Sequence, residues 1–149
     1  MGVMLRRTTF ALLLTLLAVS TAFAQKKAIT PAGSKPSPNF SAGLMVGDTL
    51  YVSGMVGRAS DGKYPAKFED EVQQTLDNIS VVVKAAGLTM ADAVAVQVYL
   101  TDMTLFDRMN GVYVKAFSDP KPTRTTVGVA KLVGEAKIEI TVTLRKVKK

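Results

Sequence analysis

One stretch of the sequence, residues 68–86, restricts the fold more than any other because its apolar residues recur every three or four positions. This spacing predicts an α-helix with one apolar face. Acidic residues at its start, Lys84 near its end and Gly87 beyond it favour the same boundaries. Such a helix must bury its apolar face, so a layered domain is expected. That face consists of Phe68, Val72, Leu76, Ile79 and Val83.

Five segments around this helix are rich in β-branched and aromatic residues and are predicted to be strands. The first two, residues 40–46 and 49–56, flank a Gly47-Asp48 turn and form a predicted hairpin. Residues 93–100 are apolar on both faces, which indicates a central strand. The remaining segments are strands at 123–130 and 137–145, with loops at 57–65 and 131–136.

A second amphipathic helix is predicted over residues 105–117, where apolar residues again follow the helical spacing. Asp119-Pro120 and Pro122 end it, because proline disfavours helical backbone in the residue before it. The predicted order is therefore β-β-α-β-α-β-β. We expect an α/β domain of two layers, with both helices on one face of a mixed sheet.

The two faces of the last strands differ in composition. Residues 138, 140, 142 and 144 are aliphatic and are expected to meet the helices, as are Thr125, Val127 and Val129. The opposite faces would then carry Arg124 and Glu139 on neighbouring strands, among Thr, Gly and Ala with few charges. A sheet face so poor in charge indicates burial against other subunits, hence a homo-oligomer.

The first 24 residues resemble an export signal. A basic pair, Arg6-Arg7, precedes the apolar run 10–19, and small residues at 21–24 predict cleavage before Gln25 and a periplasmic or secreted location. A single membrane anchor and the twin-arginine route remain alternatives. Residues 25–39 hold three prolines and three lysines and are expected to be a flexible or extended lead-in to a folded domain at 40–149.

Composition excludes much enzyme chemistry. The 149 residues include no Cys, His or Trp, so disulfides, Cys/His zinc sites and histidine-dependent triads are impossible. The formal net charge of +7 permits anionic partners. The basic residues at 145–149 are interpreted as a solvated tail, because no aromatic stacking platform accompanies them that would indicate nucleic-acid recognition.

Seven short segments, in order and spacing, resemble the RidA family, also called the YjgF or endoribonuclease L-PSP family. The resemblance covers residues 40–146. The segments are LYVSG at 50–54, QTLDNI at 74–79, AAGL at 85–88, VYLTDM at 98–103, MNGVY at 109–113, PTRTTV at 122–127 and KIEI at 137–140.

This resemblance implies a chorismate-mutase-like fold and a homotrimer with clefts between subunits. It also implies hydrolysis of reactive 2-imino acids (2-iminopropanoate and 2-iminobutanoate) and their enamine tautomers to 2-oxo acids and ammonia. The family needs no metal and no organic cofactor. Its expected ligands are small 2-imino or 2-oxo carboxylates.

The resemblance also assigns site residues. Arg124 falls at the carboxylate-binding arginine, whose guanidinium can fork onto a carboxylate. Glu139 falls at the acid that positions or activates water. Phe40 stands where many members have Tyr, and the backbone near Thr126 is expected to help hold the water. The other expected substrate contacts are Ser53, Gly54, Asn110, Tyr113 and Phe117.

Other interpretations remain open from the residues alone. Arg124 and Glu139 could simply pair with each other across neighbouring strands. The chain could also be a non-catalytic trimer that binds small carboxylates or acts as a holdase. One family name suggests ribonuclease activity, but a chain without histidine has few side chains suited to catalyse RNA cleavage.

Overall fold

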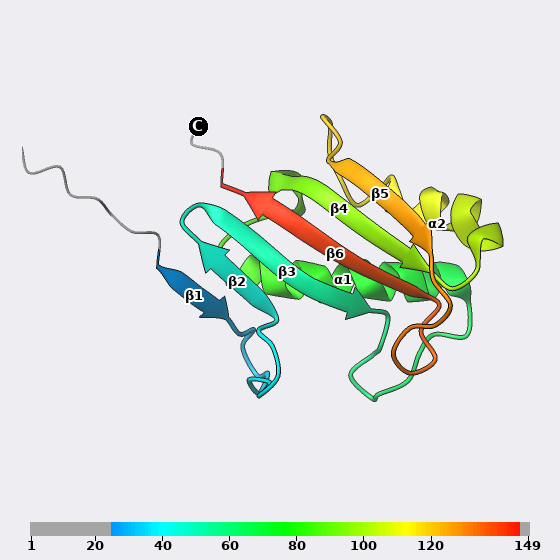
Figure 1. The fold of residues 1–149 in the computed structure, drawn as a ribbon, viewed down its shortest axis with the longest axis horizontal. Coiled ribbons are helices and arrows are strands. Elements are labelled where there is room, and N and C mark those ends of the chain that lie inside the picture. The colour runs from blue at the N-terminus through cyan, green and yellow to red at the C-terminus, as the bar shows by residue number, and fades with distance from the viewer. Residues whose placement is uncertain (1–24, 147–149) are drawn as a thin grey trace, which may run out of the picture.

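Two helices pack behind a single six-stranded sheet in the computed structural model, which describes residues 25–146. Helices α1 (Phe68–Ala85) and α2 (Phe106–Tyr113) lie on the same face of the sheet (Figure 1). The predicted two-layer fold is confirmed. The expected export signal at 1–24 lies outside the described residues. Among residues 25–146, no helix combines the length and apolarity that a membrane span requires.

The sheet is mixed. Its strands run in the order β1-β2-β3-β6-β4-β5, and every neighbouring pair is antiparallel except β4 and β5. The strands are β1 (Lys26–Ile29), β2 (Gly43–Val46), β3 (Thr49–Val56), β4 (Ala93–Leu100), β5 (Thr123–Gly128) and β6 (Ile138–Arg145). Two short 3₁₀ helices, η1 (Met90–Asp92) and η2 (Met103–Leu105), flank β4.

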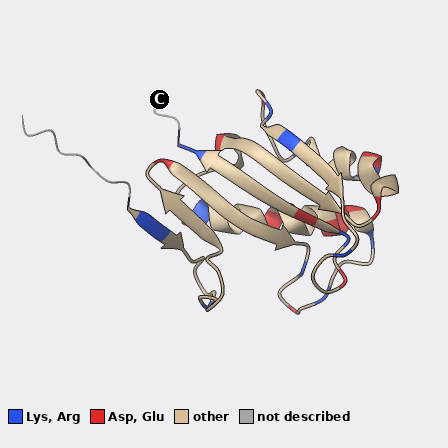
Figure 2. Cartoon of the chain, in the orientation of Figure 1, with Lys and Arg blue, Asp and Glu red and all other residues tan. Residues whose placement is uncertain are grey.

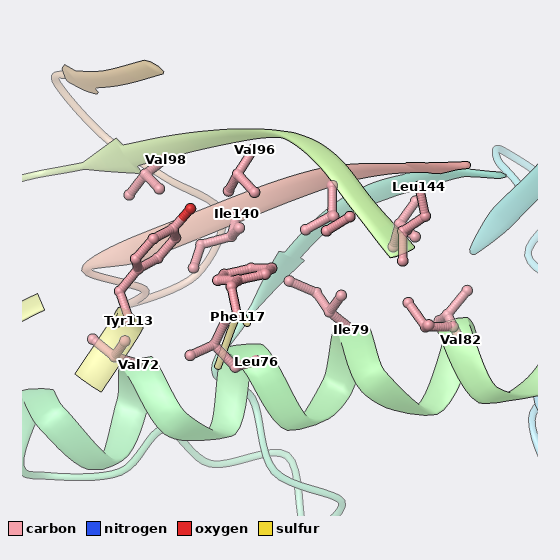
Figure 3. Packing of buried hydrophobic residues seen from close by; sticks show 14 of the residues in the cluster. Val72, Leu76, Ile79, Val82, Val96, Val98, Tyr113, Phe117, Ile140 and Leu144 are labelled. Carbon is pink, nitrogen blue, oxygen red and sulfur yellow. The ribbon is translucent and has the colours of Figure 1, made fainter. Parts of the chain in front are cut away.

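The core lies between α1 and the middle of the sheet. Strand β6 alternates buried and partly exposed residues, so its aliphatic side chains all point at the helices. Ile79 and Val72 of α1 meet them from the other layer (Figure 3). The predicted apolar face of α1 is confirmed, and β4 is central, between β6 and β5.

The second helix is shorter than predicted. Leu105 is the last residue of η2, α2 begins at Phe106 and ends at Tyr113, and residues 114–117 lie outside both helices. Asp102 caps η2 by accepting the Thr104 N–H at 2.8 Å. After Tyr113 the chain turns, and the Lys121 ammonium donates to the carbonyls of Val114 and Phe117. These contacts satisfy the polar groups that a longer helix would have paired internally.

Part of the lead-in is extended, which is one of the two predicted alternatives, and it belongs to the sheet. Residues 26–29 form β1, which pairs with β2, and Ile29 is buried. Main-chain pairing to an unoccupied strand edge does not depend on side-chain pattern, which explains why the sequence did not indicate this strand. The folded part therefore begins before Phe40.

One face of the sheet is left uncovered by the helices. The front of the sheet in Figure 2 carries few charged residues. Hydroxyl and amide groups dominate this open face, and Thr141 donates to Gln97 at 3.1 Å across it. The open face includes Ala95, Gln97, Tyr99, Thr123, Thr125, Val127, Glu139, Thr141 and Thr143.

Ile79→Ala is expected to lower the free energy of unfolding by about 2–5 kcal/mol, because the side chain is fully buried between α1 and the sheet. Chemical denaturation would measure the loss. Val81→Ala is the matched control: this residue of the same helix is 53% exposed, so a change within about 0.5 kcal/mol is expected. Equal losses in both variants would contradict this assignment of the buried face.

Candidate functional site

Arg124 lies on β5 and extends between the sheet and α2. Its Nη1 donates to Asn110 Oδ1 at 2.8 Å and reaches Met109 Sδ at 4.0 Å. The guanidinium carbon lies 4.6 Å from the ring centre of Tyr113 and 5.5 Å from that of Phe106. Two aromatic rings of α2 and one amide therefore hold the positive charge in place.

The charge of Arg124 has no carboxylate partner among the described residues. Arg108 provides a contrast, because its Nε and Nη2 donate to both oxygens of Glu69 at 2.7 and 2.9 Å. That bidentate pair lowers the pKa of the exposed Glu69 carboxyl to about 2, chiefly through the Arg108 hydrogen bond. Within residues 25–146, the Nε and Nη2 donors of Arg124 make no such bond, so a fork remains for a ligand carboxylate.

Arg124 opens onto a surface hollow of about 390 Å³ beside the end of α2. Two cations and no acid line this hollow. Burial raises the pKa of the Tyr113 hydroxyl, and the nearby Arg124 charge opposes this rise, so Tyr113 presents a neutral phenol. The lining residues are Asn110, Tyr113, Val114, Lys121, Pro122 and Arg124.

Two buried hydroxyls near this region have no hydrogen-bond partner in the described part of the chain. They are Tyr113 Oη and Thr126 Oγ1. Tyr113 directs its hydroxyl toward Val98 on the sheet (Figure 3), and Val98 is the register partner of Thr126. Unpaired buried hydroxyls are costly unless water or a ligand satisfies them. The space between β5 and α2 therefore holds a fixed cation and two buried hydroxyls that lack a partner among the described residues.

Glu139 lies on the open face of the sheet, away from Arg124. It follows the fully buried Ile138 on β6, so its side chain points to the open face. There it lies against Gly54, at a bulge in the pairing of β3 with β6. A methyl group at position 54 would overlap Glu139 Oε1, so glycine allows the carboxylate to keep its present position. Ser53 precedes Gly54 in the sequence, and its hydroxyl donates to the Ser41 carbonyl at 2.7 Å.

The expectation that Arg124 and Glu139 share a face on neighbouring strands is wrong. β4 lies between β5 and β6, and Arg124 faces α2 whereas Glu139 faces away from it. Arg124 is level with Val142, three residues along β6 from Glu139. These offsets place the two Cα atoms about 14 Å apart, so the residues do not pair.

The part of this expectation that is wrong is the orientation of β5. Thr125 and Val127 were expected to meet the helices, but they are exposed on the open face. Aliphatic side chains usually mark the core face of a strand. Here β5 is the edge strand, and the short α2 offers it the amide of Asn110 as well as rings, which suits an arginine.

The remaining predicted residues lie apart from these two groups. Phe117 is buried in the core, with its ring 4.8 Å from that of Tyr113, so it packs on one of the rings that hold Arg124 (Figure 3). Phe40 is 60% exposed and lines a separate hollow beside α1. Phe106 and Lys121 were missed, although Phe106 precedes Asn110 by one helical turn.

Metal ligands are not gathered in the described part of the chain. No group of three or more His, Cys, Asp or Glu side chains among residues 25–146 is arranged to hold an ion.

Comparison with known proteins identifies relatives across the whole folded part. The family model of Endoribonuclease L-PSP matches residues 30–145. A RutC family protein of Sulfurisphaera tokodaii is 41% identical over 115 residues, which are 76% of this chain and 92% of that protein. A 2-iminobutanoate/2-iminopropanoate deaminase of Dermatophagoides farinae is 35% identical over 113 residues, covering 74% of this chain and 88% of its own.

Solved structures agree. The crystal structure of E. coli TdcF with bound serine superimposes with a TM-score of 0.72 at 28% sequence identity, over 81% of this chain and 99% of TdcF. The fold, the family model and the relatives lead to one conclusion. The chain belongs to the endoribonuclease L-PSP family, which is also called the RidA or YjgF family.

Proposed function

We propose that this protein hydrolyses small 2-imino acids and their enamine tautomers to 2-oxo acids and ammonia. The observation that carries the proposal is Arg124, a guanidinium held by aromatic rings and an amide, without a carboxylate partner in residues 25–146. A relative with 35% identity is named as a deaminase of such imines. TdcF, a structural relative, was crystallised with serine, a small molecule that carries a carboxylate.

Arg124 would bind the substrate carboxylate through its free Nε and Nη2. A planar guanidinium and a carboxylate make two parallel hydrogen bonds, which fix the substrate's orientation. The surrounding rings restrict the arginine to one position, so less conformational entropy is lost on binding. Asn110 restrains the remaining nitrogen at 2.8 Å.

Glu139 would serve the attacking water. Water adds to the electrophilic imine carbon, and its proton passes to nitrogen, which gives a carbinolamine. The carbinolamine then forms the carbonyl and expels ammonia, so one water is consumed for each ammonia released. A carboxylate beside that water is suited to relay the protons. Gly54 leaves room for this carboxylate.

We propose further that the working form is a homotrimer in which one subunit supplies Arg124 and the next supplies Glu139. Within one chain these residues face opposite sides of the sheet, about 14 Å apart, too far for one small substrate to touch both. The uncovered face, poor in charge, supports burial against neighbouring subunits.

Export is the third part of the proposal. The mature protein would begin at Gln25 in the periplasm or outside the cell. Strand β1 begins at Lys26, so cleavage before Gln25 would leave every described helix and strand intact. A chain without cysteine has no thiol that an oxidising compartment could alter.

A non-catalytic carboxylate-binding trimer is the second candidate. It is favoured because Arg124 and the residues that hold it could bind a carboxylate without any contribution from Glu139. Thermal stabilisation by 2-oxo acids without turnover of any imine would support it.

Arg124→Ala should lower kcat/KM for imine hydrolysis by about a hundredfold, because two charge-assisted hydrogen bonds to the substrate are lost. An amino-acid oxidase would generate the imine, and release of 2-oxo acid would be followed with and without the protein. Arg108→Ala is the control, since that arginine is paired with Glu69 on the surface and should be dispensable. No acceleration by wild type, or full activity of Arg124→Ala, would refute the proposal.

Mixing the inactive variants Arg124→Ala and Glu139→Ala, after dissociation and reassembly, should restore activity. If each site takes Arg124 from one subunit and Glu139 from the next, random mixing in a ring leaves about a quarter of sites intact. Each variant alone should stay inactive, and native mass spectrometry should detect trimers. A mixture of confirmed mixed trimers that stays inactive would place both residues in one chain.

Expression of the full chain in a Gram-negative host should yield a periplasmic protein whose amino-terminal residue is Gln25, because signal peptidase reads the small residues at 22 and 24. Intact-mass measurement of the periplasmic fraction would establish this. Ala24→Phe should block the cleavage and serves as the matched variant. A membrane-bound protein that retains residues 1–24 in the wild type would instead support the anchor alternative.

A further inference from the structure

The first turn of α1 contains a carboxylate that takes no part in the chemistry described above. Glu71 is completely buried, whereas its acidic neighbours Glu69 and Asp70 are not. Burial of a carboxylate is costly unless hydrogen bonds and opposite charge compensate it. Its partners therefore indicate what the burial achieves.

Both oxygens of Glu71 are directed at one residue, Lys137, which immediately precedes β6. Oε1 accepts the Lys137 backbone N–H at 2.6 Å. Oε2 lies 3.5 Å from Lys137 Nζ and accepts no hydrogen bond from the described residues. A short hydrogen bond from a main-chain N–H to a carboxylate is among the stronger kinds in proteins. Helix α1 is thereby fixed to the first residue before β6.

Two further strand ends meet at the same point. The Lys137 carbonyl accepts the N–H of Thr101, the residue that follows β4, at 3.1 Å. Gly57, directly after β3, packs so closely on Glu71 that a methyl group there would lie 2.7 Å from Glu71 Cγ. The segments that leave β3 and β4 and enter β6 are thus held around one buried carboxylate.

Glu139 depends on this anchor because it is the second residue of β6. Only Ile138 separates it from Lys137, and a strand advances about 3.3 Å per residue. A shift at Lys137 would therefore pass to Glu139. The space for its carboxylate is narrow, because Gly54 lies directly against it.

We infer that Glu71 is a positioning residue, which sets the entry of β6 so that the Glu139 carboxylate lies where the attacking water must be held. This inference rests on the proposed function. Glu71 acts through the Lys137 main chain and touches no substrate. Binding of the substrate carboxylate belongs to Arg124, on the opposite side of the sheet, and should be independent of Glu71.

Substitutions of Glu71 separate positioning from mere support of the fold. Glu71→Met fills a similar volume without a charge, and the Lys137 ammonium that it leaves unpaired is 45% exposed, so no isolated charge is buried. We expect kcat to fall about tenfold to a hundredfold, as small misplacements of catalytic groups do, with KM changed less than about twofold. Glu71→Gln keeps an oxygen for the Lys137 N–H and should restore most of the activity.

Two controls match these variants. Lys137→Met removes the ammonium and leaves the buried Glu71 carboxylate without its opposite charge, so the free energy of unfolding should fall. It retains the backbone N–H that Glu71 binds, so kcat of the folded variant should stay near wild type. Glu69→Gln makes the same charge change two residues away, in the surface pair with Arg108, and should leave kcat unchanged. Loss of activity in either control equal to that of Glu71→Met would overturn the inference.

A second readout keeps the inference separate from the deaminase proposal. Amide hydrogen exchange at residues 138–140 should accelerate in Glu71→Met and stay near wild type in Glu71→Gln, whether or not any imine is turned over. If Glu71→Met does not fold, Glu71→Asn, one methylene shorter, replaces it with the same expectations. Wild-type exchange together with wild-type kcat in the folded variant would overturn the inference. Wild-type protein that turns over no imine refutes only the deaminase proposal and the catalytic part of this one.

Discussion

The alternation of side chains along the strands, combined with helices on only one face, determines most of what this molecule can do. On β6 every second residue supplies the core, so the residues between them must face away from the helices. Glu139 is consequently on the opposite side from Ile138 and Ile140, and no side-chain rotation brings it to Arg124. The proposed site therefore needs Arg124 from one copy of the chain and Glu139 from another.

Arg124 is held by two aromatic rings and an amide instead of a carboxylate. Contacts between a guanidinium and an aromatic ring contribute about 0.5–2 kcal/mol, and two rings lie within range here. Those contacts and Asn110 hold the charge without neutralising it. Arg108 also lies over a ring, that of Phe68, but its charge is satisfied by Glu69. Arg108 therefore forms a stabilising ion pair, whereas Arg124 remains available to a ligand.

Periodicity predicted the elements whose own sequences define their surroundings: the long helix α1, the hairpin of β2 and β3, and the central β4. Periodicity failed where contacts with a neighbouring element determine the structure of a segment. The facing of β5 depends on the polarity of α2, and β1 is held by main-chain pairing to an open edge. The family motifs suggested that Arg124 and Glu139 share a site. Alternation assigned Glu139 to the open face correctly, but it assigned Arg124 to the wrong face. Glu71 falls on the apolar stripe of α1, a spacing that distinguishes it from Glu69 and Asp70.

The central claim is that Arg124 and Glu139 act on one substrate from two subunits. The most direct measurement is a crystal structure of the protein with 2-oxobutanoate, a product of the proposed reaction. We expect the ligand's carboxylate to lie on Arg124 Nε and Nη2 of one subunit, with its carbonyl carbon beside Glu139 of the next. A ligand bound elsewhere, or one that contacts both residues within a single chain, would contradict this claim.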